Sequence, residues 1–319
     1  MRGNDERGQD LKAEEVLVGA DGSRTGQEAA DWAAQRANGR GLRLHLVRVV
    51  PAPWYYRVPA EYGKAVAGAE VLLGLERDRV AERHPTLPIG TNWHPGEPAL
   101  VLSLLSVGAE IVVIGSDRSA DSRGEGFGSV SFQTAVLCQS PVAVIPAPSV
   151  AGRTGVVVGI DGSVDSELAL KMAADEANRM GESLTVLHAV SKVLPPAAAG
   201  SRTEPGYSRK PDPRTLISEA AGNMREKFQS LTVYEALESD DSPADVLIRA
   251  AEQASLLVIG CWGRGGLRKP IGSIAEKVLM RLPCPTIITR PAPRPAADSG
   301  TQLQLPRVTY GPTRGGTRG

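Results

Sequence analysis

The sequence has few aromatic residues, few cysteines and no long apolar run, and each shortage excludes a class of protein. Aromatic side chains make up only 4% of the 319 residues, so the hydrophobic 41% must build its cores mainly from aliphatic side chains. No apolar run approaches the ~18–20 residues that span a bilayer, and the polar start, Met1–Asp10, predicts no secretory signal. The three cysteines (Cys138, Cys261 and Cys284) are an odd number without CxxC spacing, which predicts reduced thiols in a cytoplasmic protein.

The chain also lacks net charge and any recognisable catalytic motif. Lys and Arg number 36, as do Asp and Glu, which argues against a protein that binds a polyanion along its whole length. The sequence contains no Walker-type phosphate loop and no specific Ser/His/Asp or Cys/His set. We therefore expect neither a catalytic residue nor a metal site. The histidines, which have no metal-ligand spacing, are His45, His84, His94 and His188.

The strongest positive feature is an internal duplication. Val-Gly-Ala-Asp-Gly-Ser at Val18–Ser23 returns 140 residues later as Val-Gly-Ile-Asp-Gly-Ser at Val158–Ser163. The aliphatic run Ile111–Gly115 returns 145 residues later as Leu256–Gly260. Two further landmarks return 144 residues later, Gly128-Ser129 as Gly272-Ser273 and Ser140-Pro141 as Cys284-Pro285. Repeats this long indicate a duplicated domain, in agreement with a length typical of about two domains.

Each copy alternates short aliphatic runs with helical patterns, which predicts a parallel sheet covered by helices on both faces. In the first copy we expect strands at Val16–Gly19, Leu42–Val49, Ile89–Trp93, Glu110–Gly115 and Val142–Ile145. In the second copy we expect them at Val156–Ile160, Ser183–Val190, Leu231–Ala236, Leu256–Gly260 and Thr286–Thr289. A helix should begin after Ser242, because a serine before a proline is typical of an N-cap.

The remaining segments set the domain boundaries. We expect a disordered start at 1–13, a domain at 14–148, a linker at 149–154, a second domain at 155–291 and a disordered tail at 292–319. Each copy also carries an insertion rich in Pro, Gly and Tyr after its second strand, at Pro51–Gly63 and Val193–Pro213.

Two duplicated motifs lie where an open parallel sheet binds its ligands, outside the carboxyl ends of the strands. One is the loop after the first strand, with Asp21 or Asp161, whose carboxylate could accept hydrogen bonds from ribose hydroxyls or an adenine amine. The other is the Gly-Ser pair that begins a helix, where free N–H groups and the helix dipole suit a phosphate. Together these motifs predict a nucleotide site. The simpler interpretation of Asp-Gly-Ser is a turn in which the Asp side chain bonds its own backbone.

With the closing Ser/Cys-Pro-Val/Thr strand, these motifs resemble those of a tandem universal stress protein. The resemblance covers Glu14–Pro148 and Gly155–Pro291. It implies two Rossmann-like, doubly wound domains, each a five-stranded parallel sheet of order 3-2-1-4-5. It also implies dimerisation through the fifth strand, which a tandem chain can satisfy internally by pairing Val142–Ile145 with Thr286–Thr289. A homodimer of the whole chain and an unidentified protein partner stay open.

The resemblance further implies a regulatory protein of the stress response that binds ATP or AMP, with or without Mg, and hydrolyses ATP slowly at most. A residue near the end of the second strand, Val49 or Ala189, would contact the adenine. The nucleotide-binding residues implied in the first copy are Ala20, Asp21, Val49, Gly115, Gly128, Ser129 and Val130. Those implied in the second copy are Ile160, Asp161, Ala189, Gly260, Gly263, Gly272, Ser273 and Ile274.

The family's signature is a glycine, two residues, a second glycine, nine residues, and then a third glycine followed by Ser or Thr. Both copies depart from this signature. The first copy has Arg118 in place of the second glycine, and the second has a spacer of only eight residues that includes Pro270. The loop Ser116–Phe127 has a net charge of −1, from two Arg and three acids, whereas Cys261–Ile271 has +3, from two Arg and one Lys. The charge difference predicts that the second domain is the better nucleotide site.

Two other functions remain as alternatives. One is an interaction module of the same fold that has lost nucleotide binding in one or both domains. Arg118 and the short second spacer support this alternative. The other is a related doubly wound enzyme, an ATP pyrophosphatase or an electron-transfer flavoprotein, for which no specific motif is present. Two residues near the second site have uncertain roles: Cys261 is either redox-sensitive or an ordinary loop thiol, and His188 is interpreted as a packing residue near the cleft.

Overall fold

The computed structural model describes residues 15–116, 130–146, 152–191, 212–240, 242–262 and 270–291. The first half contains β1 (Glu15–Gly19), α1 (Arg24–Arg40), β2 (Arg43–Val50), the 3-10 helix η1 (Pro53–Tyr55), α2 (Pro59–Arg83), β3 (Ile89–Pro95), α3 (Pro98–Leu105), β4 (Ile111–Ser116), α4 (Val130–Leu137) and β5 (Val142–Pro146). The second half contains β6 (Val156–Gly159), α5 (Val164–Met180), β7 (Leu184–Ser191), α6 (Pro213–Lys227), β8 (Val233–Asp240), α7 (Pro243–Ala251), β9 (Leu256–Gly260), α8 (Ser273–Arg281) and β10 (Thr286–Thr289).

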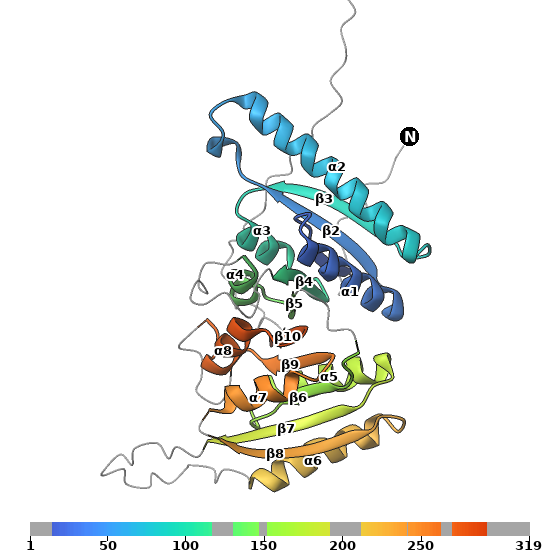
Figure 1. Cartoon of the computed structure of the whole chain (residues 1–319), viewed down its shortest axis with the longest axis vertical. Coiled ribbons are helices and arrows are strands. Elements are labelled where there is room, and N and C mark those ends of the chain that lie inside the picture. Colours follow the sequence, from blue (N-terminus) through green and yellow to red (C-terminus); the bar gives the residue numbers. More distant parts are fainter. Residues whose placement is uncertain are drawn as a thin grey trace, which may run out of the picture.

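The described strands form one continuous sheet that runs through both halves (Figure 1). Its order is β3-β2-β1-β4-β5-β10-β9-β6-β7-β8, so each half has the expected order 3-2-1-4-5. Neighbouring strands are parallel within each half. The halves join where β5 and β10 pair antiparallel, with Ile287 opposite Ala143, which confirms the predicted internal pairing of the two fifth strands.

Consecutive aliphatic residues form the central strands, where both faces of the sheet are buried. On β1, Val16 and Val18 belong to one apolar cluster and Leu17 to the other, as the alternation of side chains along a strand requires. The first cluster also contains the buried residues of α1, α2, α5 and α6, and the second those of α3, α4, α7 and α8. Each face of the sheet therefore has one core that extends through both halves. Among the described residues, no helix combines the length and the apolar character needed to cross a membrane.

The first helix of each half begins and ends in the same way. Ser23 accepts a hydrogen bond from the Gly26 N–H, and Ser163 accepts one from the Ser166 N–H, so both serines cap their helices. α1 and α5 each have 17 residues. Both end at a left-handed glycine, Gly41 or Gly181, with φ of 67° and 68°. The duplication seen in the sequence is thus preserved residue by residue in these two helices.

Several element boundaries differ from the expectation. β8 begins two residues later than predicted and continues to Asp240. The first insertion contains η1 and the start of α2, because Pro59 has the fixed φ that suits the first residue of a helix. Ser242 is the N-cap residue of α7, but its hydroxyl makes no capping bond and instead accepts a hydrogen bond from Lys277 Nζ at 3.1 Å. The start 1–13, half of the linker, most of the second insertion and the tail 292–319 lie outside the described residues.

A group of charged side chains links α1 to α5 across the junction of the halves. Arg36 Nε donates to Glu176 Oε1 at 2.9 Å, and both side chains are fully buried. Arg36 also pairs with Glu110 of its own half, and Arg179 Nη2 donates to Glu176 Oε2 at 2.8 Å. The members of this group, which we call the junction cluster, are Arg36, Arg40, Glu110, Asp175, Glu176 and Arg179. Three arginines face three acids, so their formal charges cancel.

The junction cluster makes stability depend on pH through Glu176. Burial alone would raise the pKa of this carboxyl, but the guanidinium groups of Arg36 and Arg179 outweigh burial and hold the pKa below its ordinary 4.5. Because the pKa is lowered in the folded state, ionised Glu176 stabilises the fold at pH values above 4.5. This contribution is lost as the pH falls from 4.5 towards the folded-state pKa. We expect Glu176→Gln to weaken the protein at neutral pH and to flatten its loss of stability below pH 4.5, measured as urea midpoints across pH. Glu226→Gln, at an exposed position on α6, should leave the pH profile unchanged.

Candidate functional site

The predicted nucleotide-binding residues gather at the carboxyl edge of each half. Because β1, β2 and β4 are parallel neighbours, their carboxyl ends lie together, and the same holds for β6, β7 and β9. In the first half this places Ala20 and Asp21, Val49 of β2, Gly115 of β4 and Val130 of α4 around one edge. In the second half it places Ile160 and Asp161, Ala189 of β7, Gly260 of β9 and the first turn of α8 with Gly272, Ser273 and Ile274. Gly128, Ser129 and Gly263 lie outside the described residues, as do most of the two charged loops.

The two aspartates shape the turn that precedes the first helix of each half. Asp21 Oδ1 accepts hydrogen bonds from the Ser23 N–H at 2.9 Å and from Ser23 Oγ at 2.6 Å. Asp161 Oδ1 accepts the equivalent pair from Ser163, at the same two distances. The simpler interpretation of Asp-Gly-Ser is a turn in which the Asp side chain bonds its own backbone. That turn is present in both copies. Each carboxylate fixes the serine that caps the following helix.

The backbone after β6 is held by its neighbours. The Ile160 N–H donates to Leu187 O at 2.9 Å, and the Ile160 carbonyl lies 2.6 Å from His188 Nδ1. His188 is thus more than a packing residue, because its ring fixes the loop that carries Asp161. The first half makes the same link with Arg48, whose Nη1 lies 3.4 Å from Ala20 O. The sequence interpretation missed Arg48, although it stands 140 residues before His188 and the repeat would have aligned the two.

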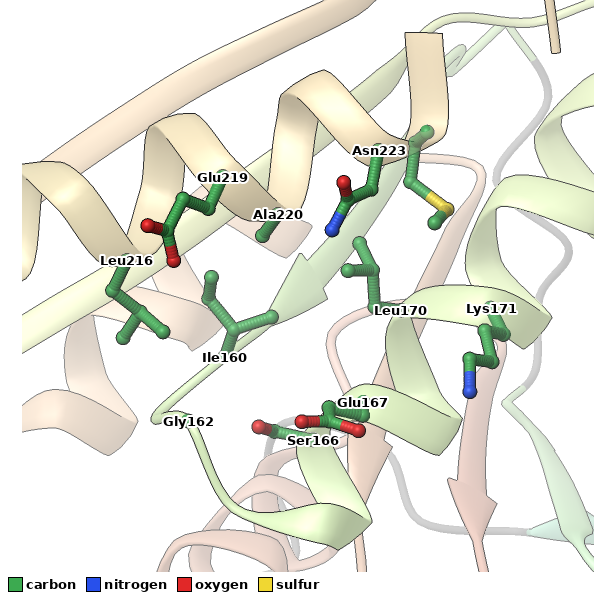
Figure 2. Close-up of a pocket in the computed structure, with 11 residues that line it drawn as sticks. Ile160, Gly162, Ser166, Glu167, Leu170, Lys171, Leu216, Glu219, Ala220 and Asn223 are labelled. Atoms are coloured by element: carbon green, nitrogen blue, oxygen red, sulfur yellow. The ribbon is translucent and has the colours of Figure 1, made fainter. Parts of the chain in front are cut away.

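The side chains of Ile160 and Ala189 lie on opposite faces of the sheet. Ile160 belongs to the cluster under α5 and α6, whereas Ala189 packs on the cluster under α7 and α8. Figure 2 shows Ile160 pointing into a cavity between α5 and α6, opposite Leu216 and Ala220. This cavity has a volume of about 320 Å³ and reaches the turn at Gly162. The two side chains therefore cannot contact a ligand from the same side.

The glycine near the end of the fourth strand serves close packing. A Cβ on Gly115 would lie 2.4 Å from the backbone carbonyl of Thr25 in the first turn of α1. A Cβ on Gly260 would lie 2.9 Å from Asp165 Cβ in the first turn of α5. Both glycines are needed because a helix begins directly against the strand. Their role in the signature is at least partly structural.

The first turn of α8 offers the N–H groups that a phosphate needs. Gly272 is the N-cap, with no side-chain capping bond, and its N–H donates to Cys261 O at 2.7 Å. The first N–H groups of a helix have no partner within the helix, and the positive end of the dipole lies beside them. Ser273 and Ile274 are exposed, so this turn is open to solvent. α8 is nine residues long.

Charged side chains of both signs surround the second site. Arg290, directly after β10, lies over the Trp262 ring at 5.6 Å and donates to the carbonyl of Val136 in the other half at 2.8 Å. Burial and repulsion by Asp161 raise the pKa of Asp165, and Arg290 opposes this rise. The first half has Pro146 at the position of Arg290 and Thr25 at that of Asp165. The second site therefore gains a cation and an acid that the first lacks.

All three cysteines are buried as free thiols, which bears on the role of Cys261. Burial raises the pKa of Cys261 and of Cys284 to about 12, and that of Cys138 to about 11. A thiol reacts as its thiolate, so a rise from 9 to about 12 lowers the reactive fraction by a factor of about 1,000. The structure favours the ordinary thiol over the redox-sensitive one. Among the described residues, no group of three His, Cys, Asp or Glu could hold a metal ion.

The thiols of the folded protein should be unreactive. We expect Ellman's reagent to label native protein at least about 100-fold more slowly than protein unfolded in urea, measured by absorbance at mildly alkaline pH, because Cys138 has the lowest thiol pKa, about 11. Rapid release of one equivalent from the native chain would show that one of the three thiols is reactive. A Cys261→Ser variant would confirm which thiol is responsible.

The model of the Universal stress protein family matches this chain twice, at residues 12–146 and 153–290. The chain belongs to the universal stress protein family. A universal stress protein of Mycobacterium tuberculosis is 30% identical over 310 residues, which cover 89% of this chain and 97% of the relative. The match along nearly the whole of both proteins supports a tandem universal stress protein with two domains.

Two solved structures extend the comparison. A universal stress protein from Archaeoglobus fulgidus has a TM-score of 0.67 at 16% identity, over 88% of this chain and 98% of that one, which supports the shared fold. A second universal stress protein from Archaeoglobus fulgidus, in complex with dAMP, has a TM-score of 0.31 at 24% identity and covers 43% of this chain and 98% of that one. The second match spans about the length of one domain.

Proposed function

We propose that this universal stress protein binds an adenine nucleotide, ATP or AMP, at the carboxyl edge of its second domain. The observation that carries the proposal is the first turn of α8, which is exposed, has no side-chain cap and begins beside the ends of β6 and β9. A helix end of this kind binds phosphate through its N–H groups. Ser273 adds a hydroxyl at the same turn.

Local charge supports the second domain over the first. Arg290 provides a guanidinium at the edge of the second domain, where the first domain has Pro146. The loop before α8 contributes a further net charge of +3, compared with −1 in the first domain. Asp161 and Asp165 reduce this positive charge, so the preference rests on the loop and on Arg290 together. We assign no protein ligand to Mg, which would arrive with the phosphates.

The proposed role is regulation by a bound ligand, with ATP hydrolysed slowly at most. Phosphoryl transfer depends on positioning groups and metal electrostatics. The described residues at the second edge offer N–H groups and a cation that fit binding. The buried, unpaired thiols support a cytoplasmic location.

Gly272→Asp tests this site without weakening the helix. The backbone at Gly272, with φ −71° and ψ 152°, suits an Asp N-cap, so the new carboxylate would bond the free N–H groups and repel phosphate. We expect ATP affinity by calorimetry to fall about tenfold or more, with thermal stability unchanged or higher. Gly68→Asp, on the exposed side of α2, is the matched control and should bind as the wild type does.

The same change in the first domain separates the two sites. Gly128→Asp should affect ATP binding less than Gly272→Asp. If ATP binding were lost only in Gly128→Asp, the assignment to the second domain would be wrong.

A second function is favoured by the turns at Asp21 and Asp161. Because each carboxylate already accepts two hydrogen bonds from a serine, the loops have a structural role that needs no nucleotide. This fits an interaction module that has lost its ligand. Absence of heat on titration with ATP and AMP at millimolar concentration would favour that function.

A further inference from the structure

Arg36 and Glu176 occupy the same position in the two copies of the repeat. Each stands thirteen residues after the serine that caps its helix, and they are 140 residues apart, which is the offset of the first motif. α1 and α5 have equal lengths, so no insertion disturbs this correspondence. A residue meets its own repeat equivalent only close to the approximate twofold axis that relates the halves. The axis therefore passes beside this ion pair.

The position on the axis carries opposite charges in the two copies. Arg36 Nε lies 2.9 Å from Glu176 Oε1, and neither side chain has any exposed surface. A pair of first halves joined in the same way would place two Arg36 guanidinium groups against each other. A pair of second halves would place two Glu176 carboxylates together. Each would bury like charges in place of a hydrogen-bonded pair.

A second position on the axis is complementary in size. Gly39 and Arg179 are also 140 residues apart, and Arg179 Cδ lies 3.6 Å from where a Cβ of Gly39 would be. The arginine thus packs over its own equivalent, which has no side chain. Two second halves would bring two Arg179 side chains to the place that one occupies. Crowding at this position adds to the charge repulsion against the same pairing.

We propose that the Arg36–Glu176 pair and the packing of Arg179 on Gly39 make each half selective for the unlike half. The fifth strand of the first half then pairs with that of a second half, and not with that of a first half from another chain. The same holds for the second half. Glu110 and Arg179 neutralise Arg36 and Glu176 within their own halves, but they do not replace the hydrogen bond across the axis. This selectivity comes from the like charges that a pairing of two like halves would bury.

Two variants of the full chain test the proposal when they are produced together. Arg36→Glu makes both axis positions acidic, and Glu176→Arg makes both basic, so neither chain has a matched pair in any arrangement. When the two variants are mixed, an acidic axis position of one chain can pair with a basic axis position of the other chain. We expect co-expressed, differently tagged variants to co-purify as a 1:1 dimer, enriched about tenfold over wild-type chains that carry the same two tags.

The control pair is Arg77→Glu with Glu226→Arg, which changes exposed charges away from the axis and should co-purify no more than the wild type does. Folding provides a second readout: where each variant alone is unfolded by circular dichroism, the mixture should regain helical signal. If the mixture neither pairs above the wild-type level nor regains structure, the axis charges do not select the partner. Equal pairing by the control variants would also overturn the proposal.

Discussion

Arg36→Glu should lower the free energy of unfolding by about 3–5 kcal/mol, the range measured when a buried ion pair is broken. The variant would place a third carboxylate beside Glu110 and Glu176 at a site with no exposed surface. The junction cluster, whose six charges now cancel, would then contain two arginines and four acids. The halves are joined here and by β5 and β10, so the loss should appear in unfolding of the whole chain.

Urea unfolding followed by circular dichroism measures this effect as a shift in midpoint. Arg36→Met should cost less than Arg36→Glu, because Arg40 and Arg179 still face Glu176. Arg77→Glu, which removes an exposed ion pair with Asp78, should change stability by no more than about 1 kcal/mol. A loss below about 1 kcal/mol in Arg36→Glu would show that the pair is not buried as described.

Gly115→Val should be the most disruptive single change at the carboxyl edge of the first domain. The first atom of the new side chain would lie 2.4 Å from the Thr25 carbonyl and 2.7 Å from the Gly26 nitrogen. Backbone atoms cannot rotate away, so α1 must shift against β4. We expect a loss of about 3 kcal/mol or more, at the upper end of the cost of overpacking.

Gly68→Ala is the matched control for this prediction. A Cβ at Gly68 would meet nothing within 4 Å, and the residue lies inside α2, so the substitution should stabilise the protein by about 0.5–1 kcal/mol. Gly260→Ala, where the new Cβ would lie 2.9 Å from Asp165 Cβ and 3.0 Å from its carbonyl carbon, should cost less than Gly115→Ala, where the Thr25 carbonyl lies at 2.4 Å. If Gly115→Val and Gly68→Ala had similar urea midpoints, the close contact of α1 with β4 would be wrong.

The fold could be predicted from the sequence because its signals are local and occur twice. The aliphatic runs located the central strands, and Thr286–Thr289 has the predicted bounds. The strand order and the internal pairing came from the resemblance, since periodicity says nothing about which strands are neighbours. The boundary of α2 was missed because Pro59, interpreted as part of an insertion, equally suits the first turn of a helix.

The candidate site was harder to predict because one motif serves two purposes. Asp-Gly-Ser can bind a ligand or form a turn, and only the contacts of Asp21 and Asp161 show that the turn is present. The role of Arg290 depends on Val136 and Trp262, which are distant in the sequence. Arg36 and Glu176 were within reach, because the repeat aligns them and shows a reversed charge. Their burial, which gives that reversal its meaning, needs the structure.

The central claim is that the chain binds an adenine nucleotide at its second domain. Mass spectrometry of material released from the purified, denatured full chain tests it most directly, with the Gly272→Asp variant prepared in parallel. We predict ATP or AMP from the wild type and markedly less from Gly272→Asp. Release of FAD, or of no nucleotide even after incubation with ATP, would contradict the account.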